Sequence, residues 1–410
     1  MKRIGVLTFH RSINTGAFIQ CYSLCQKLKK DFPDEEIEIV DYCTKRVLNN
    51  YTYHLVPYLF SELNRSSYGS GSRSGLRKIA SRSKQLLKNP GILNERRNEW
   101  LLFEKDWKQL PLSAEQLASD NVFEFTNWIK NRYDIIIVGS DCVWQYQNYP
   151  FPNAYFLHDE IGSKKLSYAG CAYKVNLNEM RDKDIEFMRQ SFSSYAYLGV
   201  RDIWTEELMH NLNIDVEYSH NCDPAFLLET DNTLTDIDKL RNKLEDLGVD
   251  FSKKIIGLQV NYELLGKMVK NAVGSECQVV AIRRRNPYAD IYIEDLSPLE
   301  WSRVFSLFHV TVTDFFHGTI LSIVNGTFPV VIETDYRMRE REKTRLNDLI
   351  NRLGMKEQYF EMHSHLDIDE KRLKECIYRS IESPGKELKS VVNREKKSYD
   401  NFKEQLSRMI

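Results

Sequence analysis

Short runs dominated by apolar residues, each ended by a polar turn, are the feature that most limits the fold of this chain. The first extends from Ile4 to Phe9, and later ones include Ile135 to Val138 and Phe328 to Ile332. A strand without polar alternation is typical of a parallel sheet that is buried on both faces. Apolar residues between 17 and 28 recur at helical spacing after the first strand. Strand, turn, helix and strand form a βαβ unit, which predicts an α/β fold with parallel sheets.

This alternation occurs twice along the chain. A length of 410 residues suits two or three domains, and Asp223-Pro224 with the polar stretch from Glu229 to Asp238 separates the two series of strands and helices. A basic stretch at about 65–90, which includes a Ser- and Gly-rich segment, is expected to be a mobile loop. We therefore predict an N-terminal Rossmann-like domain at 1–224, a C-terminal Rossmann-like domain at 225–383 and a C-terminal helix at 384–410.

Composition narrows the classes of partner. Lys and Arg number 57 against 58 Asp and Glu, a formal net charge of -1, so no excess of positive charge draws the chain to nucleic acid. No run of about 18 apolar residues is present to span a bilayer. The eight cysteines are widely spaced, as in a reduced protein, and a cytoplasmic location is expected. For the basic stretch, attraction to anionic lipid or to a polyanionic substrate is the alternative to a solvated loop.

Ligands of open parallel α/β sheets bind beyond the carboxyl ends of the strands, so the turns there contain the candidate residues. In the first turn, Asn14 offers a donor and an acceptor, and Gly16 allows close approach to the free N–H groups of the next helix. An ordinary turn is the alternative. Asp141 can accept hydrogen bonds from sugar hydroxyls or act as a base, and Trp144 can stack on a sugar. The alternatives are a helix-capping carboxylate and a core tryptophan.

The remaining candidates are charged or titratable. His317, which precedes Gly318 at a strand-to-helix turn, is the best acid or base because imidazole changes charge near neutral pH. The alternative is a buried structural histidine. Arg201 follows another strand and either grips a carboxylate or phosphate or pairs with Asp202 or another acid. Arg283 begins a run of three arginines that indicates an anion site. No metal-binding motif, P-loop or G-x-S-x-G motif is present.

Six short motifs occur in the order seen in polysaccharide pyruvyl transferases, and the chain resembles this family from about residue 3 to residue 354. The motifs are Ile4-Gly-Val-Leu-Thr-Phe-His-Arg-Ser-Ile-Asn14-Thr-Gly16-Ala17, Gly139-Ser-Asp141-Cys-Val-Trp144, Lys165-Leu-Ser-Tyr-Ala169, Val200-Arg201-Asp202, Asp223-Pro224 and Phe316-His317-Gly318-Thr319. The resemblance implies a glycosyltransferase-B-like fold, in which the parallel sheets of two Rossmann-like domains face each other across a cleft that holds the active site.

The resemblance also implies a reaction. Pyruvate would pass from phosphoenolpyruvate to two hydroxyls of one sugar, in a cell-surface polysaccharide or its lipid-linked precursor, to form a cyclic ketal. By position, His317 would protonate the donor methylene or stabilise its phosphate, and Arg201 would bind the donor. Asp141, Asn14 and Gly16 would line the acceptor side. Phosphoenolpyruvate is a co-substrate, so no cofactor or metal is expected, and a lipid-linked acceptor would bring the protein into peripheral contact with the inner face of the membrane.

One motif departs from the family pattern. Where some members have Arg-Leu-His-Gly, this chain has Phe315-Phe316-His317-Gly318, so an arginine that would contact the donor is missing. Arg283 and Arg345 are candidates to replace it, and Arg345 matches a family arginine. Two other functions remain open. A nucleotide-sugar glycosyltransferase of the same fold could use Glu333 to hold the ribose hydroxyls, and a non-catalytic carbohydrate-binding relative would result if donor binding is lost.

Overall fold

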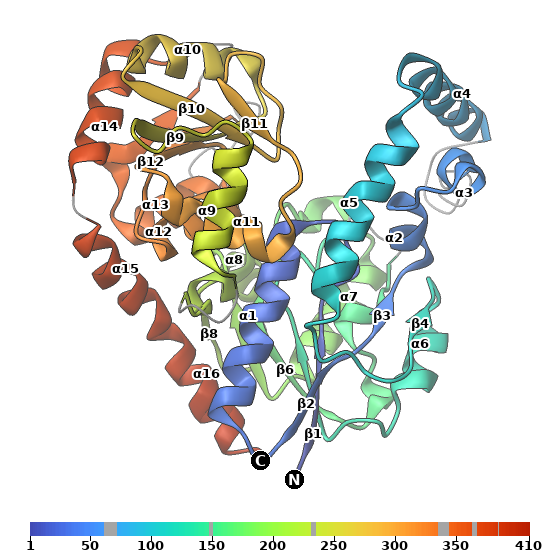
Figure 1. Ribbon diagram of the computed structural model, residues 1–410. Helices are drawn as coiled ribbons and strands as arrows, with labels where there is room; N and C mark the ends of the chain where they lie inside the picture. Colours follow the sequence, from blue (N-terminus) through green and yellow to red (C-terminus); the bar gives the residue numbers. More distant parts are fainter. Residues whose placement is uncertain (61–71, 147–150, 231–234, 335–343, 363–366, 384) are drawn as a thin grey trace. The chain divides into compact units, whose positions relative to one another are not determined.

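Residues 1–60, 72–146, 151–230, 235–334, 344–362, 367–383 and 385–410 are described by the computed structural model shown in Figure 1. The chain divides into two compact units. Unit 1 contains Met1–Pro224 and Phe402–Ile410, and unit 2 contains Ala225–Asn401. Each unit is an α/β structure built on a 6-stranded sheet, which confirms the predicted fold class. Among the described residues, no helix is both long enough and apolar enough to cross a bilayer.

The sheet of unit 1, sheet A, has the strand order β2-β1-β5-β6-β7-β8, and all of its neighbouring strands are parallel. Its strands are β1 (Arg3–Leu7), β2 (Glu36–Ile39), β5 (Ile135–Val138), β6 (Lys164–Gly170), β7 (Tyr197–Val200) and β8 (Tyr218–His220). All residues of β5 are fully buried, as expected for a central strand that is covered on both faces. The strand order reverses between β1 and β5, which makes that point the switch point of the sheet.

Helices surround sheet A, and a short parallel pair of strands lies outside it. The helices are α1 (Thr15–Asp31), α2 (Lys45–Asn50), α3 (Leu55–Phe60), α4 (Ser72–Lys88), α5 (Ile92–Trp107), α6 (Val122–Ile129), α7 (Asp182–Ser193) and α8 (Ile203–Asn211), and the pair is β3 (Tyr42–Cys43) with β4 (Leu117–Ala118). The end of the chain also belongs to this unit. The Phe402 ring lies 4.9 Å from the Tyr168 ring, and Gln405 donates hydrogen bonds to Glu217 at 3.0 Å.

Helix α4 corrects one expectation from the sequence, because the stretch 65–90 was expected to be a loop. Residues 65–71 lie outside the described residues, but 72–88 are helical. The helix packs on α3, where the Tyr58 hydroxyl donates a hydrogen bond to Gln85 Oε1 at 3.1 Å. Apolar residues recur on one face of α4 at intervals of three and four, but the serines, arginines and glycine between them obscure this pattern.

The sheet of unit 2, sheet C, has the strand order β11-β10-β9-β12-β13-β14, which is the order of a Rossmann fold, and its strands are also parallel. They are β9 (Lys254–Gln259), β10 (Cys277–Ile282), β11 (Ile291–Ile293), β12 (Val310–Thr313), β13 (Phe328–Glu333) and β14 (Tyr359–Glu361). The order reverses between β9 and β12. The carboxyl ends of these two strands, at Gln259 and Thr313, therefore mark the position where a doubly wound sheet binds its ligand.

Capping residues mark the ends of some helices of unit 2. The helices of this unit are α9 (Ile237–Asp246), α10 (Glu263–Val273), α11 (Pro298–Val304), α12 (Phe316–Val324), α13 (Arg345–Leu353), α14 (Glu370–Glu382), α15 (Lys386–Lys396) and α16 (Ser398–Ser407), the last of which ends in unit 1. Ser297 and Glu300 form a capping box at the start of α11. Gly354 adopts a φ of 72° after α13. Helices α10 and α14 pack together on one face of sheet C (Figure 1).

Candidate functional site

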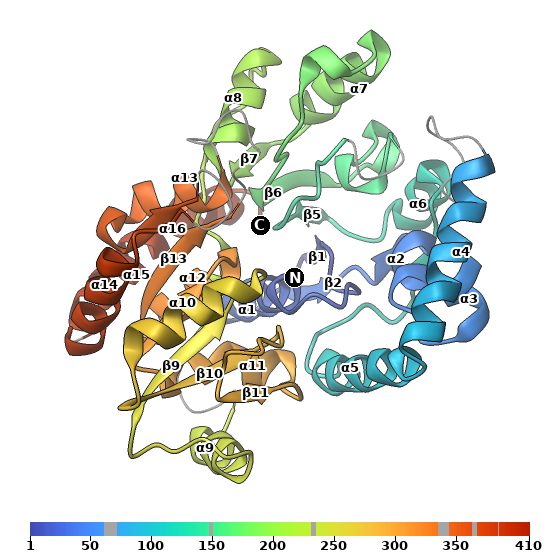
Figure 2. The same cartoon turned by 90° about the horizontal axis from the view of Figure 1, so that it is seen from above.

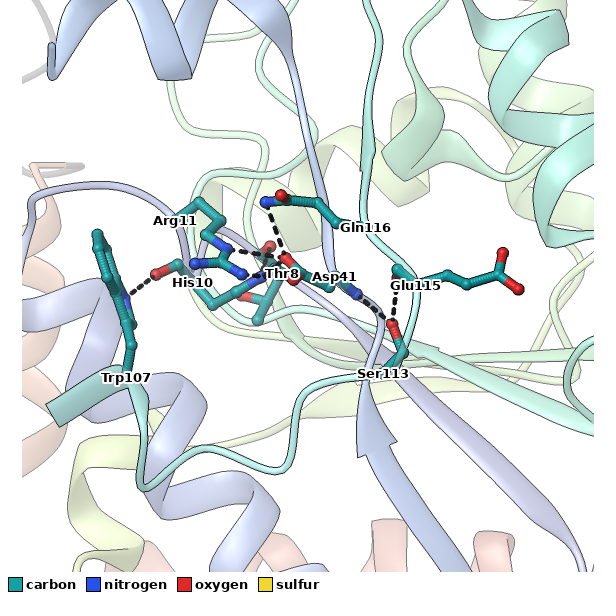
Figure 3. Close-up of polar contacts among 8 residues, drawn as sticks. All are labelled: Thr8, His10, Arg11, Asp41, Trp107, Ser113, Glu115 and Gln116. Atoms are coloured by element: carbon teal, nitrogen blue, oxygen red, sulfur yellow. Dashed lines mark hydrogen bonds and ion pairs between the residues drawn. The ribbon is translucent and has the colours of Figure 1, made fainter. Parts of the chain in front are cut away.

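The turn after β1 contains a buried charge cluster that the sequence analysis does not single out (Figure 3). His10 is fully buried, and its Nε2 donates a hydrogen bond to Asp41 Oδ1 at 2.9 Å. Arg11 donates to the same oxygen from Nε at 2.8 Å and to Oδ2 from Nη2. Trp107 Nε1 donates to the His10 carbonyl at 2.8 Å, and its ring lies 5.5 Å below the Arg11 guanidinium. His10 follows β1 and Asp41 follows β2, so the cluster joins the carboxyl ends of two neighbouring strands.

The surroundings of Asp41 decide its charge. Burial alone would raise the pKa of this carboxyl, but hydrogen bonds and positive charges from His10 and Arg11 outweigh burial and lower the pKa to about 2. The carboxylate is therefore ionised at neutral pH and holds the turn after β1 against the end of β2. This cluster fixes the backbone that leads into α1.

Asp41→Asn should lower the free energy of unfolding at neutral pH by about 2 kcal/mol, because a depressed carboxyl pKa favours the folded state at every pH above the unfolded value of about 3.9. This contribution is lost as the pH falls from about 4 to 2. Between these pH values, the free energy of unfolding should therefore fall less steeply in the variant than in the parent. Denaturation followed by tryptophan fluorescence tests this, since unit 1 contains five of the six tryptophans. The control is Asp238→Asn on the exposed side of α9, and equal acid limbs for the parent and Asp41→Asn would contradict the prediction.

Asn14 and Gly16 lie at the amino terminus of α1. The Asn14 side chain caps this helix, because its Oδ1 accepts hydrogen bonds from Gly16 N at 3.0 Å and Ala17 N at 3.4 Å. This is the ordinary structural role that the sequence analysis left open beside acceptor binding. A role in lining the acceptor side stays a prediction for both residues, and it would have to use the Asn14 amide group, because the Oδ1 atom is committed to the cap.

Arg201 forms a buried ion pair in unit 1, and its predicted role in binding the donor stays a prediction. Its side chain is 1% exposed, and Nη1 donates to Asp223 Oδ2 at 3.0 Å. Gln20 Nε2 donates to the same oxygen at 2.6 Å. Arg201 Nη2 also lies 3.5 Å from Cys142 Sγ. The structure therefore supports the alternative that Arg201 pairs with an acid. The acid is Asp223 and not Asp202, because the Asp202 side chain caps α8. The buried guanidinium therefore links the end of β7 to Asp223, which follows β8, at the carboxyl edge of sheet A.

Asp141 and Trp144 follow β5 at the switch point of sheet A, but only Asp141 keeps access to the surface. Asp141 is 9% exposed, has a φ of 82°, and accepts a hydrogen bond from Cys142 N at 2.7 Å. Trp144 is fully buried, its Nε1 donates to the Tyr155 carbonyl at 3.2 Å, and its ring packs edge-on against Phe192 at 4.8 Å. The expectation that Trp144 stacks on a sugar is therefore wrong, because its ring contacts the protein core.

In unit 2, His317 occupies the second position of α12, directly after the switch-point strand β12. The imidazole is half-buried and meets the Phe316 ring edge-on at 5.3 Å, and the Arg345 guanidinium lies 5.8 Å from the same ring. The N-cap residue is Phe315, and its apolar side chain cannot accept a capping hydrogen bond. The amino terminus of α12 thus presents main-chain donors and the positive end of the helix dipole beside an imidazole and a guanidinium, which is a suitable setting for an anion.

Gly318 allows α12 to approach the end of β9 closely. A Cβ atom at this position would lie 2.5 Å from Gln259 Oε1 and 2.7 Å from Thr313 Oγ1, so no other residue fits without displacing them. The Gln259 side chain is 1% exposed, and its Oε1 has no hydrogen-bond partner among the described residues. The glycine of the His-Gly motif therefore serves packing at the switch point.

Asp314 is a second titratable group at this edge, and the sequence analysis missed it. Its carboxylate accepts hydrogen bonds from Asn261 N at 3.0 Å and from Thr334 Oγ1 at 3.4 Å. Burial raises its pKa to about 6, since these hydrogen bonds only partly offset desolvation. The rule that ligand-binding residues follow the strands at a switch point would have indicated it, because Asp314 comes directly after β12.

Two further predicted residues lie at the same edge of sheet C. Arg283 follows β10, is half-buried and has a φ of 62°. Glu333, the candidate for holding a ribose, ends β13 with 7% exposure and accepts a hydrogen bond from Thr344 Oγ1 at 2.5 Å. In the part of the chain that the structure describes, no group of three or more His, Cys, Asp or Glu could hold a metal ion. Unit 2 thus places His317 and Gly318 at the start of α12, with the Arg345 guanidinium over the neighbouring Phe316 ring.

Solved structures show the same type of fold at low sequence identity. UDP-GlcNAc 2-epimerase from Neisseria meningitidis, bound to UDP-GlcNAc, is 12% identical over 100% of both chains with a TM-score of 0.56. The UDP-GlcNAc 2-epimerase of Methanocaldococcus jannaschii is 10% identical, with 96% of this chain and 99% of that chain covered and a TM-score of 0.48. The first similarity supports a glycosyltransferase-B-like fold and nothing further. No curated protein sequence matches the chain significantly.

A sequence model of one family matches most of the chain. It is described as polysaccharide pyruvyl transferase and spans residues 14–336. The match includes the turn at the start of α1, the strands of sheet A from β2 onward, and both switch-point strands of sheet C with the His317-Gly318 motif. The chain therefore belongs to the polysaccharide pyruvyl transferase family.

Proposed function

We propose that the protein transfers pyruvate from phosphoenolpyruvate to two hydroxyls of one sugar in a cell-surface polysaccharide or its lipid-linked precursor, with formation of a cyclic ketal. The observation that carries this proposal is the position of His317 and Gly318 in a member of this family. They lie in the first turn of α12, whose N-cap residue Phe315 makes no side-chain capping bond, at the switch point of a Rossmann sheet. Membership of the family supports a transferase that acts on a glycan.

The donor chemistry suits the residues at the start of α12. Phosphoenolpyruvate carries about three negative charges, and its phosphate is the kind of group that helix amino termini and arginines bind. We assign the phosphate to the first turn of α12 and to Arg345, whose guanidinium lies over the neighbouring Phe316 ring. Arg345 would thereby take over the contact of the family arginine whose place is occupied by Phe315 in this chain.

His317 is the proposed acid. Transfer of its proton to the methylene carbon of phosphoenolpyruvate creates a methyl group and an oxocarbenium-like centre at the adjacent carbon, which the first sugar hydroxyl attacks. The second hydroxyl then displaces phosphate and closes the ketal ring. Of the two protons released by the hydroxyls, one restores His317 and the other leaves with the phosphate, so the step is balanced without a cofactor. A positioned acid accelerates such a reaction by typically 10²–10⁴-fold.

The residues of unit 1 at the carboxyl edge of sheet A are proposed for the acceptor. Asp141 is the best placed of them, because it lies after the switch-point strand β5 and is 9% exposed, whereas Trp144 of the same motif is fully buried. It would accept hydrogen bonds from the sugar hydroxyls or remove their protons. If the acceptor is lipid-linked, the reaction takes place at a membrane surface.

Thermal unfolding with added ligand tests the donor. A ligand at 100 times its dissociation constant stabilises a protein by about 2.7 kcal/mol, so phosphoenolpyruvate should raise the melting temperature measurably. UDP and GDP should have no effect. A response to a nucleotide alone would favour the glycosyltransferase alternative, which the burial of Glu333 against Thr344 does not support. No response to any of the three would favour a non-catalytic carbohydrate-binding protein.

Release of phosphate from phosphoenolpyruvate, measured with a panel of sugars, then identifies the acceptor.

A further inference from the structure

Helix α4 concentrates positive charge in a chain that is otherwise balanced. Between residues 72 and 94 the sequence contains six Lys or Arg and no Asp or Glu, whereas the whole chain has a formal net charge of -1. Segregated charge of this kind creates a local positive field that neutral overall composition conceals. Residues 72–88 of this segment form a regular helix.

Two lysines of α4 lie on its outward side. Half-buried residues mark the inward side, and they are Ile79, Arg82, Ser83 and Leu86. Lys84, Leu87 and Lys88 are exposed on the opposite side, and Leu87 is 83% exposed. We call this side of the helix, defined by Lys84, Leu87 and Lys88, the α4 surface.

Helix α3 adds exposed apolar residues beside α4 and fixes the helix in place. Leu55 and Val56, at the start of α3, are 49% and 65% exposed. Tyr58 of the same helix is buried between the Arg82 and Arg96 guanidinium groups, which lie 5.1 Å and 4.8 Å from its ring. Figures 1 and 2 both show α3 and α4 together at the outer end of α5, at the periphery of unit 1.

We propose that the α4 surface binds the surface of an anionic phospholipid bilayer. An exposed leucine has no meaning by itself, but large apolar side chains among lysines on a helix match the requirements of a membrane interface. Lys84 and Lys88 contact the anionic headgroups, and Leu87 enters the boundary of the acyl chains. A hydrated polyanion such as a nucleic acid or a charged polysaccharide would satisfy the same cations but would leave Leu87 in water. The charge and the apolar exposure together therefore favour a bilayer.

The proposed contact is peripheral, and it is separate from the residues assigned to the reaction. It depends on a helix that contains none of the predicted site residues, so it does not rest on the donor or on the ketal chemistry. Its consequence for function would be location, since an enzyme held at a bilayer meets a lipid-linked glycan at a raised local concentration. Failure of lipid binding would leave pyruvyl transfer to a soluble sugar unaffected, and absence of transfer would leave lipid binding unaffected.

Co-sedimentation of the full chain with vesicles tests the proposal. The protein should sediment with vesicles of phosphatidylcholine mixed with phosphatidylglycerol and stay in solution with phosphatidylcholine alone. Lys84→Glu/Lys88→Glu should reduce the partition coefficient at least about tenfold, because each basic residue near an anionic surface contributes strongly to binding. The matched control is Lys371→Glu/Lys374→Glu, which makes the same change of charge on the exposed side of α14 and should bind as the parent does.

Leu87→Ser separates a bilayer from other polyanions. This variant should lose affinity for anionic vesicles and keep the parent's affinity for dextran sulfate, a soluble polyanion without an apolar phase. Unchanged vesicle binding by either the double variant or Leu87→Ser would overturn the proposal, as would equal binding to both kinds of vesicle. Binding to dextran sulfate without binding to vesicles would also overturn it, and would identify the partner as a polyanion. Circular dichroism of the variants checks that α4 stays helical.

Discussion

His317→Gln is expected to lower kcat by about 10²–10⁴-fold, the contribution of one positioned acid. Glutamine keeps a polar side chain of similar length at the start of α12 but has no proton to transfer at neutral pH. The half-buried ring packs edge-on against Phe316 and is not part of the core of unit 2, so we expect the variant to fold. Phosphate release from phosphoenolpyruvate in the presence of an accepted sugar measures the effect.

The same variant distinguishes the two roles considered for His317. If the imidazole protonates the methylene carbon, kcat falls while phosphoenolpyruvate stabilises the variant as strongly as the parent. If it binds the phosphate, the dissociation constant of phosphoenolpyruvate rises as well. His210→Gln, an exposed histidine on α8, is the control and should retain the parent's kcat. A parental kcat in His317→Gln would remove this residue from the mechanism.

The central strands of both sheets could be predicted because burial on both faces leaves a local signature. Ile135 to Val138 consists only of apolar β-branched residues, and all four are fully buried in β5. The edge strands lack this signature. β8, at Tyr218–His220, is exposed at its first residue and half-buried at the other two. Its place in the sheet is set by pairing with β7, which is a long-range property that no local pattern contains.

Contacts within the candidate site illustrate the same limit. The sequence analysis identified Arg201 and the Asp223-Pro224 motif separately, but it did not pair them, because the two residues follow different strands. The structure joins them at 3.0 Å across the ends of β7 and β8. His10 and Asp41 are paired in the same way across β1 and β2. A search for opposite charges directly after neighbouring parallel strands would have found both pairs.

Side-chain burial after a strand could not be predicted in this way. Asp141 and Trp144 are three residues apart in one motif, yet the first reaches the surface and the second is enclosed by the core. The difference depends on the direction in which the turn after β5 continues, and Asp141 takes a φ of 82° there. Backbone conformations of this kind are uncommon for residues other than glycine and are specified by tertiary packing. The motif therefore indicated the site but not which side chains face a ligand.

Arg201→Met is expected to lower the free energy of unfolding of unit 1 by about 3–5 kcal/mol, the usual cost of removing one partner from a buried ion pair. The substitution keeps most of the side-chain volume but leaves the Asp223 carboxylate, which is 1% exposed, without its guanidinium. Gln20 Nε2 remains as a donor at 2.6 Å, but a neutral donor does not replace the positive charge of a guanidinium beside a buried carboxylate. Arg408→Met, which removes an exposed pair with Glu404, is the control and should cost less than about 1 kcal/mol.

The double variant Arg201→Met/Asp223→Asn separates a structural arginine from one that binds the donor. Asparagine is neutral and can still accept the hydrogen bond from Gln20, so most of the lost stability should return, as is common when both charges of a buried pair are removed. If the pair is structural, the double variant melts close to the parent and binds phosphoenolpyruvate as the parent does. If Arg201 instead grips the donor, stability changes little in the single variant and the affinity for phosphoenolpyruvate falls in both. A structural role thus changes the stability but not the donor affinity, and a binding role changes the donor affinity but not the stability. Denaturation curves with and without phosphoenolpyruvate decide between the two roles.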